Sequence, residues 1–212
     1  MRTVLLTGFE PFDQDTVNPS WEAVRLLDGT SHGDVRIVGR QLPCAFALAP
    51  ARLHQLLEEF EPELVIAVGL GPGRADICIE RVAININDAR IPDNLGAQPI
   101  DTPVVPDGPA AYFSTLPIKT MVRALKEAGI ASSVSHTAGT FVCNQVFYCL
   151  QHVLAGSAVR AGFIHVPALP EQAEQCGGPS MALSIQTEGL RIAVITALDT
   201  FHDVRESGGQ IS

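Results

Sequence analysis

The residues with the clearest chemical potential lie in the stretch TAGTFVCNQVFYCL, residues 137–150. Apolar residues recur from Val142 to Val153 at the spacing of one helical stripe, so we predict a helix that begins beside Cys143. In its first turn, unpaired backbone N–H groups and the helix dipole would favour a thiolate. The same N–H groups could form an oxyanion hole. The alternative is that Cys143 fills the core, as we expect for Cys149, because free cysteine is among the most buried residue types.

A cysteine nucleophile needs a base, and the sequence holds six histidines. His165 ends the predicted strand AGFIHVP, and we expect two adjacent βα connections to bring it to Cys143 at the carboxyl edge of the sheet. His136, in the strand before Cys143, stays a second candidate. His152 is predicted to face away from Cys143 on the same helix. From position alone, a hydrogen-bonded structural role explains His165 equally well.

Glu80 is the best candidate for a carboxylate that orients the imidazole. It is a lone acid in the apolar run DICIERVAIN, on the predicted face of Cys78, Val82 and Ile84. A buried carboxylate needs a cation or a hydrogen-bond donor beside it. Arg81 is the simplest partner, although adjacent strand residues point to opposite faces. Loop aspartates compete for the same role, but such residues more often form turns; these are Asp88, Asp93 and Asp101.

Composition excludes several classes of function. The net charge of −9 and pI of about 5.0 argue against binding to nucleic acid or to an anionic membrane surface. We expect no membrane span and no signal peptide, because no apolar run is long enough. Five scattered cysteines without a C-x-x-C pair predict free thiols in a reducing cytoplasm. No cluster has the spacing of metal ligands, and the GLGPG turn leads to a strand rather than the helix of a nucleotide site.

Strand and helix signals alternate along the 212 residues. We predict strands over residues 3–9, 35–43, 63–70, 75–85, 131–139 and 160–167. We predict helices over residues 18–29, 50–60, 117–129, 142–153 and 180–204, with a long loop over 88–117. The alternation indicates a single three-layer α/β/α domain over residues 1–212, with a mainly parallel twisted sheet.

Four long motifs, in order, resemble those of the pyrrolidone-carboxylate peptidases (pyroglutamyl peptidase type I). They are LLTGFEPFDQDTVNPSWEA, ERVAININDARIPDNLGAQPID, SHTAGTFVCNQVFY and RAGFIHVPALPEQ. The resemblance implies a cysteine peptidase that removes an N-terminal pyroglutamyl residue from peptides. It implies Cys143 as the nucleophile, His165 as general base and acid, and Glu80 as the orienting carboxylate.

The resemblance also implies a substrate pocket, a location and an assembly. The pocket residues of the family correspond here to Phe9, Phe12, Asn18, Phe141 and Val142, and Arg90 falls within one of the motifs. Members of the family need no metal or cofactor, are cytoplasmic, and in many cases form homotetramers. Leu70 departs from the glutamine of many bacterial relatives, and the loop FDQDTVNPS departs from a common glycine-rich version.

Two other hypotheses fit the same fold. One is an α/β enzyme such as a phosphorylase that acts on nucleosides, with the GLGPG turn holding phosphate. The other is a non-catalytic binding or assembly protein, in which Cys143 would react no faster than free cysteine.

Overall fold

The computed structural model describes residues 2–209, with all side chains except those of Gln175 and Cys176. Seven strands form one sheet in the order β2-β3-β1-β4-β9-β5-β8. Their bounds are β1 Arg2–Phe9, β2 Ser31–His32, β3 Val35–Leu42, β4 Leu64–Leu70, β5 Ile77–Glu80, β8 Ser132–Ser135 and β9 Arg160–Val166. Strands β3, β1, β4 and β9 are parallel. This confirms the predicted mainly parallel sheet.

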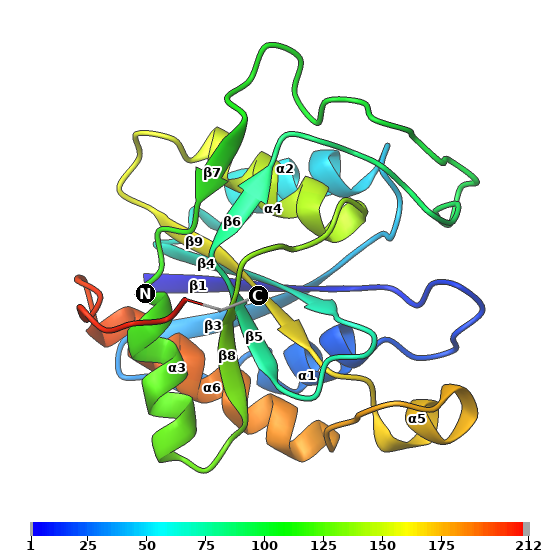
Figure 1. Cartoon of the computed structure of the whole chain (residues 1–212). Coiled ribbons are helices and arrows are strands. Elements are labelled where there is room, and N and C mark those ends of the chain that lie inside the picture. Colours follow the sequence, from blue (N-terminus) through cyan, green and yellow to red (C-terminus); the bar gives the residue numbers. More distant parts are fainter. Residues whose placement is uncertain (1, 210–212) are drawn as a thin grey trace.

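Helices cover both faces of the sheet, as Figure 1 shows. Helices α1 (Pro19–Leu27), α3 (Ile118–Glu127) and α6 (Leu183–Asp199) share one apolar cluster with the sheet. Helices α2 (Ala49–Phe60) and α4 (Val142–Val153) pack into a second cluster, on the opposite face. Alternate residues of the central strands supply the two clusters, since successive side chains of a strand point to opposite faces. The three-layer α/β/α prediction is therefore confirmed.

Helix α1 begins as its sequence predicts. Asn18 is the N-cap, and its side chain accepts a hydrogen bond of 3.1 Å from the Ser20 N–H. Pro19 occupies the first helical position, where its missing N–H costs nothing. Asn18 also donates to the carbonyl of Glu10 at 3.0 Å, which ties the helix to the segment that follows β1.

The strand predicted over residues 75–85 is divided at Arg81. Its first part is β5, in the main sheet, whereas β6 (Val82–Ile84) pairs with β7 (Ala111–Phe113) in a separate two-stranded sheet. Strand β7 lies inside the predicted long loop. The prediction failed because a strand pattern that continues through residues 75–85 does not show where the chain leaves one sheet for another.

The predicted route from His165 to Cys143 also needs correction. Strand β5 pairs parallel with β8 and antiparallel with β9, so β8 runs opposite to β9. The carboxyl ends of β8 and β9 therefore lie at opposite edges of the sheet. Residues 136–141 connect β8 to the beginning of α4 and carry the chain to the cysteine.

The last part of the chain holds a helix that the sequence did not predict, α5 (Pro170–Cys176). The helix predicted over residues 180–204 is shorter and begins at Leu183. Gly189 does not interrupt it, and its missing side chain lets α6 approach the sheet. A Cβ at Gly189 would lie 2.4 Å from the Cδ1 of Ile77.

Candidate active site

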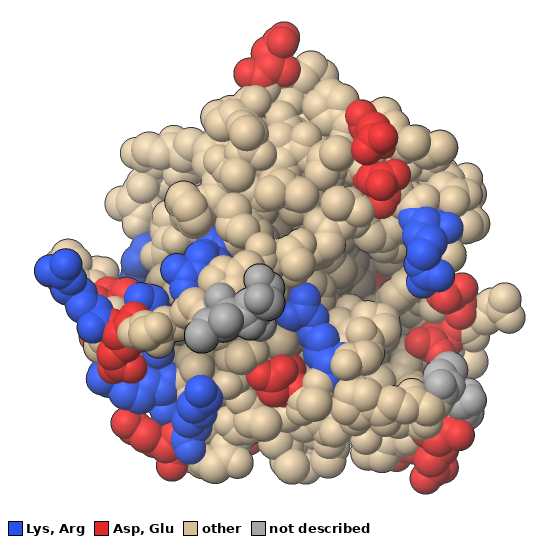
Figure 2. All heavy atoms as spheres, in the orientation of Figure 1, with Lys and Arg blue, Asp and Glu red and all other residues tan. Residues whose placement is uncertain are grey.

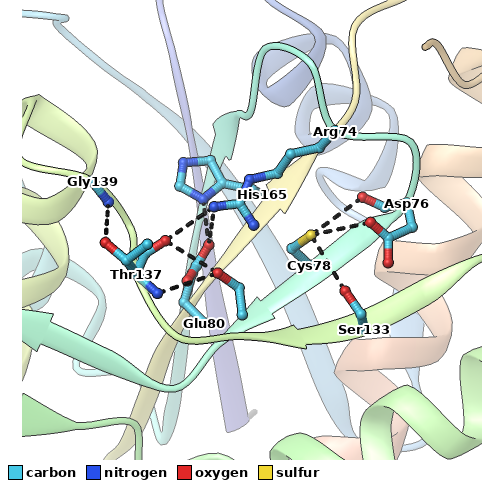
Figure 3. A network of polar contacts seen from close by, with 9 residues as sticks. Arg74, Asp76, Cys78, Glu80, Ser133, Thr137, Gly139 and His165 are labelled. Carbon is cyan, nitrogen blue, oxygen red and sulfur yellow. Dashed lines mark hydrogen bonds and ion pairs between the residues drawn. The ribbon is translucent and has the colours of Figure 1, made fainter. Parts of the chain in front are cut away.

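Glu80 and His165 meet because of the register between β5 and β9. Cys78 lies opposite His165 in this antiparallel pair, so both side chains share a face with Glu80, two residues further on. The Nδ1 of His165 lies 2.7 Å from the Oε1 of Glu80, and both residues are buried (Figure 3). Because a carboxylate can only accept, Nδ1 carries the hydrogen and Nε2 is the basic ring nitrogen.

Cys143 is the second residue of α4, as predicted. The N-cap residue Phe141 offers no side-chain hydrogen bond, so this side chain leaves the first N–H groups of α4 uncapped. A Cβ at Gly69 would lie 2.8 Å from the Sγ of Cys143, and Gly69 is the neighbour of His165 across β4 and β9. The sulfur of Cys143 therefore lies against Gly69, the residue of β4 that is paired with His165 of β9.

Cys143 and His165 line the same cavity. It has a volume of about 370 Å³, and its lining includes Cys143, His165, Arg74, Leu70, Phe12 and Phe141. Asp88 and Arg90 are exposed residues of the same lining. Larger hollows of about 510, 470 and 390 Å³ lie along α3, beside α5 and beside the beginning of α2, but none of the three is lined by the cysteine or the histidine. We therefore identify the 370 Å³ cavity as the candidate active site.

The five residues expected to bind substrate fall into two groups. Phe12 and Phe141 line the cavity with ring centroids 6.1 Å apart. Phe9, Asn18 and Val142 are buried and are not part of the cavity lining. Phe9 packs against Phe163, and the side chain of Asn18 caps α1.

The competing residues have other partners. His152 forms a hydrogen bond of 2.8 Å between its Nδ1 and the Tyr112 hydroxyl, and it does not line the cavity. His136 also lies outside the lining. Asp93 accepts hydrogen bonds from the backbone N–H groups of Phe46, Leu95 and Ala97, as expected of a turn-forming loop residue. The geometry therefore favours His165 and Glu80 as the partners of Cys143.

Sequence reasoning missed Arg74, which pairs with Glu80. One terminal guanidinium nitrogen lies 3.3 Å from the Oε1 of Glu80. Arg81, the simplest partner by sequence, instead donates a hydrogen bond to the carbonyl of Gly208. The sequence feature that contains Arg74 is the GLGPGR turn, residues 69–74, which was interpreted only as a possible phosphate-binding turn. As predicted, a strand follows this turn, which disfavours a nucleotide site.

The electrostatics of Cys143 contradict one expectation. Burial raises the pKa of the Cys143 thiol, and the nearby Cys44 and Glu80 raise it further. Arg74 and the backbone N–H of Cys143 lower this pKa, but their effect is smaller than that of burial. The helix terminus therefore does not produce a free thiolate at neutral pH, and the proton must be removed by a base.

Other features bear on the class of protein. Within residues 2–209, no helix is long and apolar enough to cross a membrane. The described side chains include no group of three or more histidine, cysteine or acidic residues that could hold a metal ion. Cys44, Cys78, Cys143 and Cys149 are free thiols, and the side chain of Cys176 lies outside the described part.

Comparison with known proteins identifies the family of this chain. The family model for pyroglutamyl peptidase matches residues 2–200. The pyrrolidone-carboxylate peptidases of Pseudomonas fluorescens and Cupriavidus taiwanensis are 70% and 62% identical, over 100% of each chain. The crystal structure of pyroglutamyl peptidase I from Bacillus amyloliquefaciens is similar, with a TM-score of 0.95 and 46% identity, over 97% of this chain and 99% of that one. The chain therefore belongs to the pyroglutamyl peptidase family.

Proposed function

We propose that this chain is a cysteine peptidase that removes the N-terminal pyroglutamyl residue of peptides through Cys143, His165 and Glu80. The family membership supports the substrate class. The observation that carries the mechanism is the hydrogen bond of 2.7 Å between the buried Glu80 and His165, which lines the same cavity as Cys143. We further propose that residues 1–212 act as one peptidase domain.

The reaction begins with transfer of the Cys143 proton to Nε2 of His165 as the sulfur attacks the pyroglutamyl carbonyl carbon. Because burial raises the pKa of the thiol, Cys143 depends on His165 to accept its proton. The protonated His165 then gives its proton to the leaving amine, and the thioester remains. Water, deprotonated by His165, hydrolyses the thioester and releases pyroglutamate and the free thiol. Glu80 stabilises the imidazolium at each stage.

The N–H groups at the beginning of α4 can stabilise the negative charge of the tetrahedral intermediate. The first N–H groups of a helix lack partners within it, and the N-cap side chain supplies none here. These donors and the positive end of the helix dipole are fixed before the substrate arrives. We propose that they bind the oxyanion.

The cavity suits a neutral five-membered lactam. A pyroglutamyl group has no ammonium, so it needs apolar walls and a few amide hydrogen bonds instead of acids. Phe12 and Phe141 supply aromatic walls, and Leu70 supplies a buried aliphatic one. A site that pairs the ring carbonyl should reject proline, which lacks it, by several orders of magnitude.

One assay tests the substrate and the nucleophile together. The purified protein is incubated with a chromogenic pyroglutamyl amide and with the matching prolyl amide. We expect cleavage of the first alone, loss of activity in Cys143→Ser and Cys143→Ala, and full activity in the control Cys149→Ser. Normal turnover by folded Cys143→Ala would refute the mechanism, and equal cleavage of both amides would refute the proposed specificity.

We also propose that the protein acts in the cytoplasm as a homo-oligomer, without nucleic acid or a membrane partner. Phe113 on β7 and the loop residues Leu95 and Ile100 are exposed apolar side chains. In Figure 2 the surface around β6 and β7 is mostly uncharged, with isolated acidic side chains towards the loop that joins the two strands. Such a surface is typical of a protein interface. Light scattering on the wild type and on Phe113→Asp tests this, and a wild type that is monomeric at micromolar concentration would refute it.

A further inference from the structure

We infer that Arg74 is a positioning residue of the active site, which holds Glu80 and the segment before Cys143 in one arrangement. The inference rests on the proposed function and adds a fourth residue to it. Arg74 does not need to touch the substrate for this role, because it acts through Glu80 and through the backbone that leads to α4.

Glu80 is the group in the site whose charge is most costly to bury. Its side chain is fully buried, and both of its polar contacts go to the same oxygen, Oε1, from His165 at 2.7 Å and from Arg74 at 3.3 Å. The other oxygen, Oε2, has no hydrogen-bond partner among the described residues. A buried carboxylate with so few partners is costly unless a permanent cation lies beside it. Arg74 is always protonated and supplies that cation.

Arg74 also contacts the segment that carries the nucleophile. The guanidinium nitrogen that pairs with Glu80 donates a hydrogen bond of 3.0 Å to the carbonyl of Thr137 (Figure 3). That carbonyl accepts a second hydrogen bond, of 3.1 Å, from the hydroxyl of Ser135. Residues 137–141 line the cavity and lead directly into α4. One side chain therefore links the orienting carboxylate to the connection that places the cysteine.

The path of the Arg74 side chain is built into the turn after β4. The Arg74 N–H donates to the carbonyl of Gly71 at 3.1 Å. A Cβ at Gly71 would lie 2.6 Å from the Cδ of Arg74 and 3.2 Å from the Cβ of His165. The absence of a side chain at position 71 lets the arginine cross beside the histidine strand to reach Glu80. This packing sets the guanidinium in place before the substrate binds.

The test separates positioning from substrate binding. We expect Arg74→Met to lower kcat for a pyroglutamyl amide by roughly 10–100-fold, with KM changed by less than about threefold, since a charged contact is lost. Arg74→Lys should recover part of kcat. Added guanidinium ion should raise the activity of Arg74→Met, because the side chain reaches the cavity. The imidazole N–H resonance of the His165–Glu80 hydrogen bond should shift in the NMR spectrum of Arg74→Met.

The matched control is Arg191→Met, which removes an arginine that pairs with Glu188 on the exposed surface of α6. It should change none of these readouts. Unchanged kcat and resonance in Arg74→Met would overturn the inference, as would a rise in KM alone, which marks a substrate contact. Should Arg74→Met not fold, Arg74→Gln replaces it, and failure of both to fold would also overturn the inference. Absence of wild-type activity would instead refute the proposed function.

Discussion

Replacement of Glu80 by glutamine is the sharpest perturbation of this site, because it removes one charge and almost no volume. In the wild type, Oε1 of Glu80 accepts from Nδ1 of His165 at 2.7 Å and faces Arg74 at 3.3 Å. An amide at position 80 can present its NH₂ group to the ring. The imidazole can then turn to the other tautomer, with Nε2 protonated and unable to take the proton of Cys143.

The size of the effect follows from this change of tautomer and from the loss of charge. A similar exchange in a serine protease triad lowers kcat about 10⁴-fold. Here Arg74 remains beside the site, so we expect a loss of kcat of roughly 10²–10⁴-fold, or about 3–5 kcal/mol of transition-state stabilisation. The loss should be smaller than that in Cys143→Ala, because the orienting group is not consumed in the reaction.

Stability should change less than activity. The side chain of Arg74 is 26% exposed, so water can partly replace the lost carboxylate charge. We expect Glu80→Gln to lower the free energy of unfolding by about 1–2 kcal/mol, below the range for an unpaired charge in a fully buried pair. The control is Glu188→Gln on α6, whose exposed pair with Arg191 should contribute less than about 1 kcal/mol.

The assay combines steady-state kinetics on the chromogenic amide with thermal unfolding followed by circular dichroism. A folded Glu80→Gln enzyme with kcat within threefold of the wild type would refute the role of the carboxylate. Complete loss of activity together with unfolding would show that Glu80 serves the fold and not the reaction.

Three further predictions use the same protein. Burial raises the pKa of Cys149 to about 11, so its alkylation by iodoacetamide should rise about tenfold per pH unit from pH 7 to 10, as measured by mass spectrometry. Gly69→Ala should lower kcat by at least tenfold, because the new Cβ would lie 2.8 Å from the Sγ of Cys143 and displace it. Asn18→Ala should lower the free energy of unfolding by about 2 kcal/mol through loss of the N-cap, a fall in Tm of roughly 4–8 °C.

Each of these has its own control. Cys149→Ser identifies the labelled peptide, and a pH-independent rate would contradict the burial argument. Gly209→Ala, where a Cβ would meet no atom within 4 Å, should be neutral. Unchanged kcat in Gly69→Ala would show that the sulfur can move aside without loss of function. For Asn18→Ala, an unchanged Tm would mean that water caps α1 as well as the amide does.

The sequence was most informative where local rules decide the structure. The N-cap at Asn18, the buried strand β4 and the beginning of α4 beside Cys143 follow from capping chemistry and hydrophobic periodicity. Strand direction depends on contacts between distant segments, so the antiparallel pairing of β5 with β9 could not be read locally. The sequence placed cysteine, histidine and glutamate near one another. In the structure His165 contacts Glu80 and lines one cavity with Cys143, but the path of the chain across the sheet differs from the predicted one.

The electrostatic partners of the site were the least predictable part. Arg81 is adjacent to Glu80 in sequence, but the partner is Arg74, which returns to the carboxylate from the preceding turn. The pKa of Cys143 likewise depends on how much of the sulfur is removed from water, and that follows from packing across the whole cavity. The backbone N–H at the helix end lowers this pKa, but burial raises it by more.

The shortness of β5 has a consequence for how the gene can change. Strand β5 has only four residues, Ile77–Glu80, and Glu80 is the last of them. Their side chains alternate between the two faces of the sheet. A deletion or insertion of one codon within this strand would turn the glutamate toward the helices α3 and α6 and place an aliphatic side chain against the imidazole. The coding region for these four residues should therefore tolerate substitution far better than any change in length.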